Sequence, residues 1–115
     1  MEVLMHSSEF QPMYISLKQN QKSDEATWNA LQTIITDLKK SNKPLGIHHK
    51  LKEVPKDYRK KYDLQSLYHF EMPHSNRLMI TVRRGPYGGK QALLLHLLDH
   101  NKYNKVLRLF KKRSH

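Results

Sequence analysis

Histidine and arginine are the side chains of this sequence best suited to chemistry. The chain has eight histidines, and its 21 lysines and arginines outnumber 10 acidic residues, for a formal net charge of +11. Histidine has an unperturbed pKa of about 6.5, so it can accept or donate a proton near neutral pH. The planar guanidinium of arginine can donate two hydrogen bonds to one phosphate. Proton transfer beside a bound phosphate is therefore the chemistry that these residue types favour.

The strong positive charge indicates a polyanionic partner. Nucleic acid is the first interpretation, an acidic protein segment the second and an anionic membrane surface the third. The absence of cysteine excludes disulfides, thiolate zinc sites and a cysteine nucleophile. No apolar run approaches the roughly 18 residues of a membrane-spanning helix, and residues 1–6 lack the basic segment of a secretory signal. We therefore expect one cytoplasmic domain over residues 1–115, without membrane association and with a basic C-terminal segment at residues 104–115.

The first forty residues have the pattern of a strand followed by two helices. Residues 2–6 form a short apolar run. One face of a first helix is marked by residues spaced three and four apart, namely Phe10, Tyr14 and Leu17. Ser7 or Ser8 can cap this helix, and Ser23 opens a second helix that ends at Lys40. The short polar link between them predicts an antiparallel helical hairpin.

Residues 67–72 and 77–83 predict two strands, and the register given below leaves residues 73–75 as a three-residue loop between them. Apolar residues recur at alternate positions in both: Tyr68, Phe70 and Met72 in the first, and Leu78, Ile80 and Val82 in the second. Residues that face each other across two strands share a face of the sheet. The apolar face is therefore continuous only if Phe70 lies opposite Leu78.

That register puts His69 and Glu71 on the same face as Arg77, with Glu71 directly opposite Arg77. A slip of one residue would turn Arg77 into the core, where an unpaired charge is costly. Two interpretations stay open for each residue. His69 is either a proton-transfer group or an exposed strand residue, and Arg77 either binds phosphate or forms a salt bridge with Glu71.

The remaining segments divide into basic and apolar stretches. Residues 41–66 form a long basic connection between the helices and the hairpin. Its cations either bind phosphates without selecting a nucleotide sequence or form only a solvated basic surface. These cations are Lys50, Lys52, Lys56, Arg59, Lys60 and Lys61. Residues 84–90 predict a hairpin turn, since the spacing of their glycines fits neither the Walker phosphate-binding loop nor the dinucleotide-binding fingerprint. Residues 92–98 are nearly unbroken leucine and predict a strand buried on both faces. Within it, His96 is predicted to be a hydrogen-bonded core residue rather than a ligand.

Four stretches of the chain, in sequence order, resemble motifs of the RelE/ParE toxin superfamily. Residues 43–52 are similar to a proline–leucine stretch, and residues 67–71 to a tyrosine-containing strand. Residues 76–80 are similar to an arginine–leucine strand, and residues 97–103 to a closing Asp-His segment that ends in tyrosine. The resemblance spans residues 2–104. It implies an α+β fold in which an N-terminal strand and helical hairpin pack on a curved, mainly antiparallel sheet of about four strands.

The resemblance also implies a function and the residues that perform it. Many members are toxins that cleave mRNA in the ribosomal A site and are held inactive by an antitoxin. Arg77 matches the hairpin arginine that binds the scissile phosphate, and His69 matches the histidine of the histidine-dependent members. His100 and Tyr103 match a histidine and a tyrosine near the C-terminus of the family. The residues alone also allow His100 simply to end the preceding strand and Tyr103 to pack a C-terminal turn against the sheet rather than stack on a base. Where the lysine-dependent members have a second lysine, this chain has Glu71.

The expected function is thus a ribosome-dependent endoribonuclease, a translation-inhibiting toxin that uses the ribose 2′-hydroxyl as nucleophile. Its partners would be mRNA, the ribosome and a cognate antitoxin, with no cofactor, metal ion or small-molecule ligand. Glu71, and Ile80 in place of the usual tyrosine, favour an alternative in which a ParE-like or antitoxin-bound protein binds without catalysis. A general basic nucleic-acid-binding protein is the third possibility.

Overall fold

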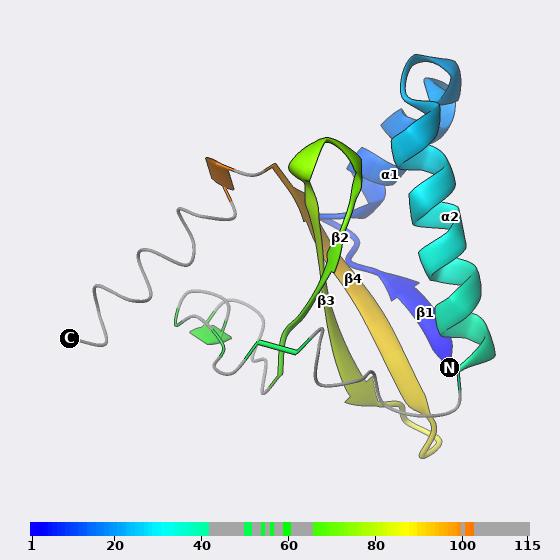
Figure 1. Cartoon of the computed structure of the whole chain (residues 1–115). Helices are drawn as coiled ribbons and strands as arrows, with labels where there is room; N and C mark the ends of the chain where they lie inside the picture. Colours follow the sequence, from blue (N-terminus) through cyan, green and yellow to red (C-terminus); the bar gives the residue numbers. More distant parts are fainter. Residues whose placement is uncertain are drawn as a thin grey trace.

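The computed structural model has an α+β architecture, in which helices pack on one face of a mixed sheet (Figure 1). Within the part of the chain that it describes, there are two α-helices and four strands. The described residues are 1–41, 50, 51, 54, 56, 59, 60, 66–99, 101 and 102.

The first helix, α1, runs from Gln11 to Gln19. Its N-cap position is Phe10, and no side chain caps the helix, so the predicted cap at Ser7 or Ser8 is wrong. Phe10 is instead fully buried in the apolar core, and burial of that ring fixes where the chain enters the helix. The predicted apolar face of this helix is confirmed, since Tyr14 and Leu17 pack against the same core.

The second helix, α2, runs from Glu25 to Lys40, after a short 3₁₀ turn (η1, Gln21–Ser23). Its cap is Asp24 rather than the predicted Ser23, because the Asp24 carboxylate accepts a hydrogen bond from the backbone N–H of Thr27 at 3.3 Å. Buried residues follow helical spacing on the face toward the sheet: Thr27, Leu31, Ile35 and Leu38.

Contacts between aromatic and polar side chains join the two helices. The rings of Tyr14 and Trp28 lie 5.5 Å apart, and the side-chain amide of Gln32 donates to the Tyr14 hydroxyl at 3.3 Å. Tyr14 thus contacts successive turns of α2, and the predicted helical hairpin is confirmed. Neither described helix is both long enough and apolar enough to cross a lipid bilayer.

The sheet has the strand order β1-β4-β3-β2. The edge strand β1 (Glu2–Met5) is parallel to β4 (Lys90–Leu98). The other pairs are antiparallel, with β3 (Arg77–Arg84) between β4 and β2 (Tyr68–Glu71). The expected mainly antiparallel sheet is therefore confirmed.

The predicted register of the β2–β3 hairpin is also confirmed, since Phe70 pairs with Leu78 and Glu71 with Arg77. The three-residue loop is the turn η2 (Pro73–Ser75), which is closed by a hydrogen bond from the Met72 N–H to the Asn76 carbonyl at 3.0 Å.

The hairpin tip rests near the start of α2. His74 and Ser75 both have positive φ, 63° and 61°, which the tight reversal of the chain requires. His74 Nε2 lies 3.4 Å from Asp24 Oδ1. The pKa of Asp24 is lowered, first by the neighbouring Thr27 side chain, then by the Thr27 backbone N–H and by the charge of His74.

One β-bulge interrupts the pairing of β3 with β4. Met79 pairs with His96 and Ile80 pairs with Leu94, which leaves Leu95 as an extra residue on β4. The bulge brings Leu95 and His96 to the same position beside Met79. Beyond it, Leu97 returns to the face that packs on the helices.

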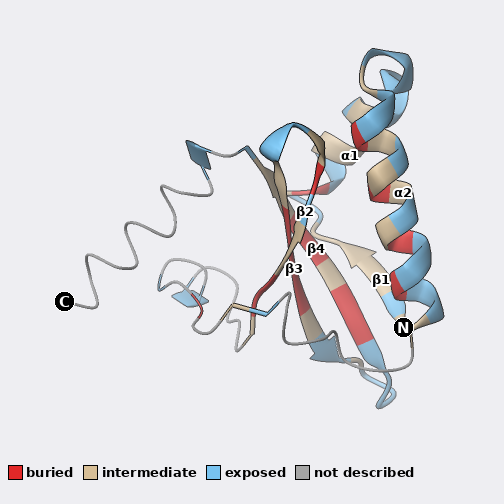
Figure 2. Ribbon diagram, viewed as in Figure 1, coloured by how far each residue is buried: buried red, intermediate tan, exposed pale blue. Residues whose placement is uncertain are grey.

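Each face of the sheet carries its own apolar cluster. The helix-facing cluster joins β3 and β4 to the buried face of α2 and to partly buried apolar residues of α1. The cluster on the opposite face contains Val54, Leu67, Met79 and Leu95. Figure 2 shows the buried residues along β3, β4 and the sheet side of α2. The prediction that residues 92–98 are buried on both faces is thus confirmed for the middle of β4.

Candidate functional site

His69 and Arg77 lie on the face of the sheet that is turned away from the helices. His69 pairs with Met79, and Arg77 lies two residues before Met79 on β3. Residues placed diagonally in this way have Cα atoms about 7–8 Å apart, within reach of long side chains. Both side chains are half-buried. The prediction that they share one face is confirmed, and the chemical roles given to them stay predictions.

The Arg77 guanidinium already has contacts within the protein. Its Nη2 lies 3.7 Å from Glu71 Oε1, and its Nη1 donates to the Asn76 carbonyl at 3.1 Å. The Arg77 side chain is 21% exposed, whereas that of Glu71 is 84% exposed. Because the carboxylate lies in water, such a pair contributes only about 0–1 kcal/mol. The guanidinium is therefore oriented by these contacts.

Three described residues of the basic connection, Lys50, Leu51 and Val54, lie beside β2 or against this same face. Lys50 forms an antiparallel bridge with Tyr68, and the Leu51 N–H donates to the Leu67 carbonyl at 2.8 Å. Leu51 and Val54 pack against the apolar cluster that contains Met79. Four of the predicted phosphate-binding cations are described and exposed: Lys50, Lys56, Arg59 and Lys60. Lys52 and Lys61 lie outside the described residues.

His100 and Tyr103 also lie outside the described residues. The roles that the resemblance implies for them therefore stay predictions.

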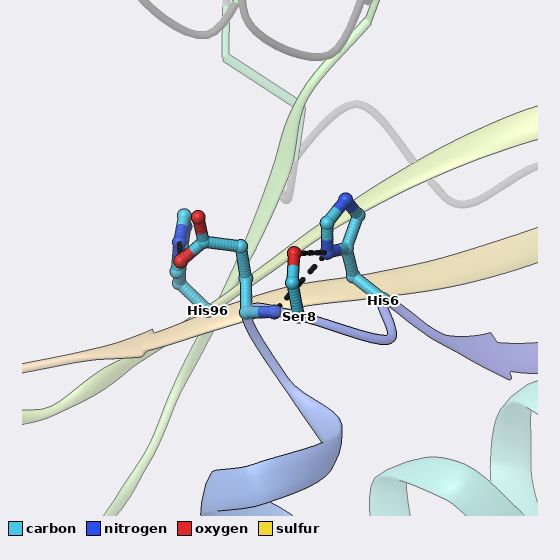
Figure 3. A network of polar contacts seen from close by, with 4 residues as sticks. His6, Ser8 and His96 are labelled. Atoms are coloured by element: carbon cyan, nitrogen blue, oxygen red, sulfur yellow. Dashed lines mark hydrogen bonds and ion pairs between the residues drawn. The ribbon is translucent and has the colours of Figure 1, made fainter.

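A polar network that sequence reasoning missed surrounds the turn between β1 and α1. His96 Nε2 lies 3.1 Å from Glu9 Oε2, and the Glu9 backbone N–H donates to His6 Nδ1 at 3.2 Å. The Ser8 hydroxyl lies 3.3 Å from the same nitrogen of His6. Figure 3 shows His6, Ser8 and His96 on one side of the β4 ribbon, while α1 leaves on the other side. The prediction that His96 is hydrogen-bonded is confirmed, although it is half-buried rather than in the core.

Because of the bulge, His96 of this polar network lies opposite Met79, in line with His69 of the hairpin. His69 on β2 and His96 on β4 both pair with Met79, so they flank it in one row across the sheet. Because neighbouring strands lie about 4.8 Å apart and β3 lies between β2 and β4, the backbones at His69 and His96 are about 10 Å from each other. A carboxylate such as that of Glu9 can hold a histidine in one orientation and tautomer. No signal in the sequence joins these residues, since Glu9 and His96 are 87 positions apart.

Among the described residues, no three histidine, aspartate or glutamate side chains gather in a group that could hold a metal ion.

Comparison of the chain with models of protein families, with curated proteins and with solved structures found no match.

Proposed function

We propose that this protein is a RelE-like toxin, an endoribonuclease that cleaves mRNA in the ribosomal A site. The observation that carries the proposal is the position of His69 and Arg77 as diagonal neighbours on one face of the β2–β3 hairpin. Leu51 and Val54 of the basic connection belong to the apolar cluster on this face. The exposed cations Lys56, Arg59 and Lys60 of the same connection are proposed to contact the phosphates of the polyanion.

The proposed reaction is transesterification within the RNA strand. A base removes the proton of the ribose 2′-hydroxyl, whose oxygen attacks the adjacent phosphorus. The bond from phosphorus to the 5′-oxygen breaks, and an acid protonates that oxygen as it leaves. The products are a 2′,3′-cyclic phosphate and a 5′-hydroxyl end. His69 and His100 supply the acid and the base, Arg77 stabilises the negative charge of the phosphorane, and Tyr103 stacks on a base.

The partners follow from this function. The protein acts in the cytoplasm on mRNA and the ribosome, and an antitoxin with an acidic segment neutralises it by covering the basic face.

The test is inducible expression in a bacterial host, followed by growth measurement and mapping of mRNA 5′ ends. His69→Ala and Arg77→Ala should each reduce cleavage by at least 10²-fold, the usual contribution of one proton-transfer or oxyanion-stabilising group. Lys18→Ala is the matched control, because it removes an exposed cation from α1 and should leave cleavage unchanged. Unchanged cleavage in both site variants, with folding verified by circular dichroism, would reject the assignment.

One observation favours a second candidate, a binding protein without catalysis. Glu71 and the Asn76 carbonyl both engage the Arg77 guanidinium, and a permanently engaged arginine could not bind the phosphorane. Such a protein would arrest growth and leave ribosome-bound mRNA intact. A general basic nucleic-acid-binding protein would instead bind RNA in a salt-sensitive manner without arresting growth.

A further inference from the structure

The turn between β3 and β4 presents the most exposed aromatic ring of the described residues. Tyr87 is 99% exposed, and it lies in the turn that follows Arg84 and precedes Lys90. Figure 1 shows this turn at the opposite end of the sheet from the β2–β3 hairpin tip. Since the ring buries no surface, it adds nothing to the apolar core, and the stability of the fold does not account for it.

The turn holds Tyr87 in a defined position. The Gly85 N–H donates to the Gly89 carbonyl at 2.6 Å, and the Gly88 N–H donates to the Gly85 carbonyl at 3.1 Å. Gly88 has a φ of 90°, a conformation that glycine adopts without steric cost. The ring is therefore carried on a closed, hydrogen-bonded turn, and binding a ligand would cost little ordering of the chain.

Cations flank the ring on both strands. Arg84 and Lys90 are exposed and lie opposite each other as the last pair of the ladder. Arg83 is also exposed, and its Nε donates to the Gln91 side-chain oxygen at 3.3 Å. One described carboxylate lies nearby, that of Glu2, which accepts a hydrogen bond from Gln91 at 2.7 Å. The tip thus combines an accessible aromatic face with an excess of positive charge.

We propose that this turn is a second nucleic-acid contact, which binds an unpaired nucleotide of RNA. Tyr87 stacks on the exposed base, while Arg84 and Lys90 contact the phosphates on either side of it. A base offers a flat face to the ring, and stacking of this kind is a main source of affinity for single strands. In a duplex that face is covered by neighbouring bases. An acidic peptide could engage the cations, but it offers nothing flat for the ring.

The contact is separate from the proposed cleavage site. Met79, which lies beside His69, is five residues before Arg84 on β3, a distance of about 17 Å at roughly 3.3 Å per residue. The turn therefore binds RNA whether or not His69 and Arg77 cleave it.

The experiment measures binding of a fluorescein-labelled 12-nucleotide oligoadenylate by anisotropy, with all variants made in a His69→Ala background. That background prevents cleavage during the measurement. Tyr87→Ala should weaken binding by about 5- to 150-fold, the loss of one base–aromatic stack, and Tyr87→Phe should stay within twofold of the parent. The double variant Arg84→Gln/Lys90→Gln should lower the slope of log affinity against log salt by about 0.7 for each cation removed.

Three further measurements test whether the turn binds single-stranded RNA, duplex RNA or an acidic peptide. Duplex RNA of the same length should bind Tyr87→Ala and the parent equally. In a Trp28→Phe/Tyr87→Trp variant, the fluorescence of the new tryptophan should be quenched by the oligoadenylate. An unchanged affinity of Tyr87→Ala, or an equal loss on single-stranded and duplex RNA, would overturn the proposal. Binding of a polyglutamate peptide that depends on Tyr87 as strongly as the RNA does would assign the turn to an acidic protein instead.

Discussion

Replacing Glu71 with glutamine should strengthen RNA binding, because it removes the carboxylate that competes with phosphate for Arg77. Two unit charges 3.7 Å apart attract each other by about 1 kcal/mol in water. The water value applies because the Glu71 side chain is 84% exposed. The substitution should therefore lower the free energy of unfolding by less than about 1 kcal/mol. It should raise affinity for a phosphate at Arg77 by up to about fivefold, since about 1.4 kcal/mol corresponds to tenfold.

The assay is fluorescence anisotropy with a short single-stranded RNA at several salt concentrations, in a His69→Ala background. One additional phosphate contact should steepen the slope of log affinity against log salt by up to about 0.7. Asp37→Asn is the matched control, because it changes the net charge equally from an exposed position on α2. Equal gains in the two variants would show a general charge effect. Weaker binding in Glu71→Gln would refute the competition between carboxylate and phosphate.

Three other predictions concern the elements that position the face. Leu95→Ala should lower the free energy of unfolding, measured by urea titration, by about 2–5 kcal/mol, because Leu95 is fully buried beside Met79. The control is Ile15→Ala, at an exposed site. A loss of stability in Leu95→Ala no larger than in this control would contradict the packing of Leu95. Ser75→Gly should raise the free energy of unfolding by about 1 kcal/mol, since Ser75 has a φ of 61°, and a destabilised variant would contradict this. The lowered pKa of Asp24 stabilises the fold fully above its ordinary pKa of about 3.9 and progressively less as the pH falls below it. The difference in melting temperature between the parent and Asp24→Asn, which keeps a capping side chain, should therefore shrink below pH ~3.9, and a constant difference would count against it.

The hairpin could be predicted from the sequence because its alternation left one acceptable register. With Phe70 opposite Leu78, the alternating apolar sets of the two strands share the face toward the helices, and a slip of one residue would turn Arg77 to that face. Alternation also fixed which polar residues share the other face. For this reason the placement of His69 with Arg77 followed directly from residue types and spacing.

The bulge in β4 could not be predicted, and neither could the polar network beside it. Residues 92–98 are almost all leucine, so no alternation marks where an extra residue interrupts the pairing. The face of His96 is decided by that extra residue, Leu95. Its partner Glu9 is brought near only by the parallel pairing of β1 with β4, which depends on tertiary contacts rather than on a local pattern.

Helix ends were shifted for a similar reason. Ser7, Ser8 and Ser23 are good capping residues, but burial of Phe10 set the start of α1. Asp24 took the capping position of α2, where it also approaches the hairpin tip at His74. At the start of α1, core packing thus outweighed the capping preference of the serines. At the start of α2, the contact with His74 from a distant turn supports Asp24 as the cap.

The parallel pairing of β1 with β4 has a consequence for how the protein is made. Glu2 and Gln91, which meet across these strands, are 89 positions apart. Closing so large a loop delays folding, because its entropy is lost before the contact is gained. During synthesis, the helical hairpin can form early, while β1 must wait for β4 to leave the ribosome. Until then, β1 lacks the strand with which it pairs, and the high positive charge of the nascent chain opposes its association with neighbouring chains.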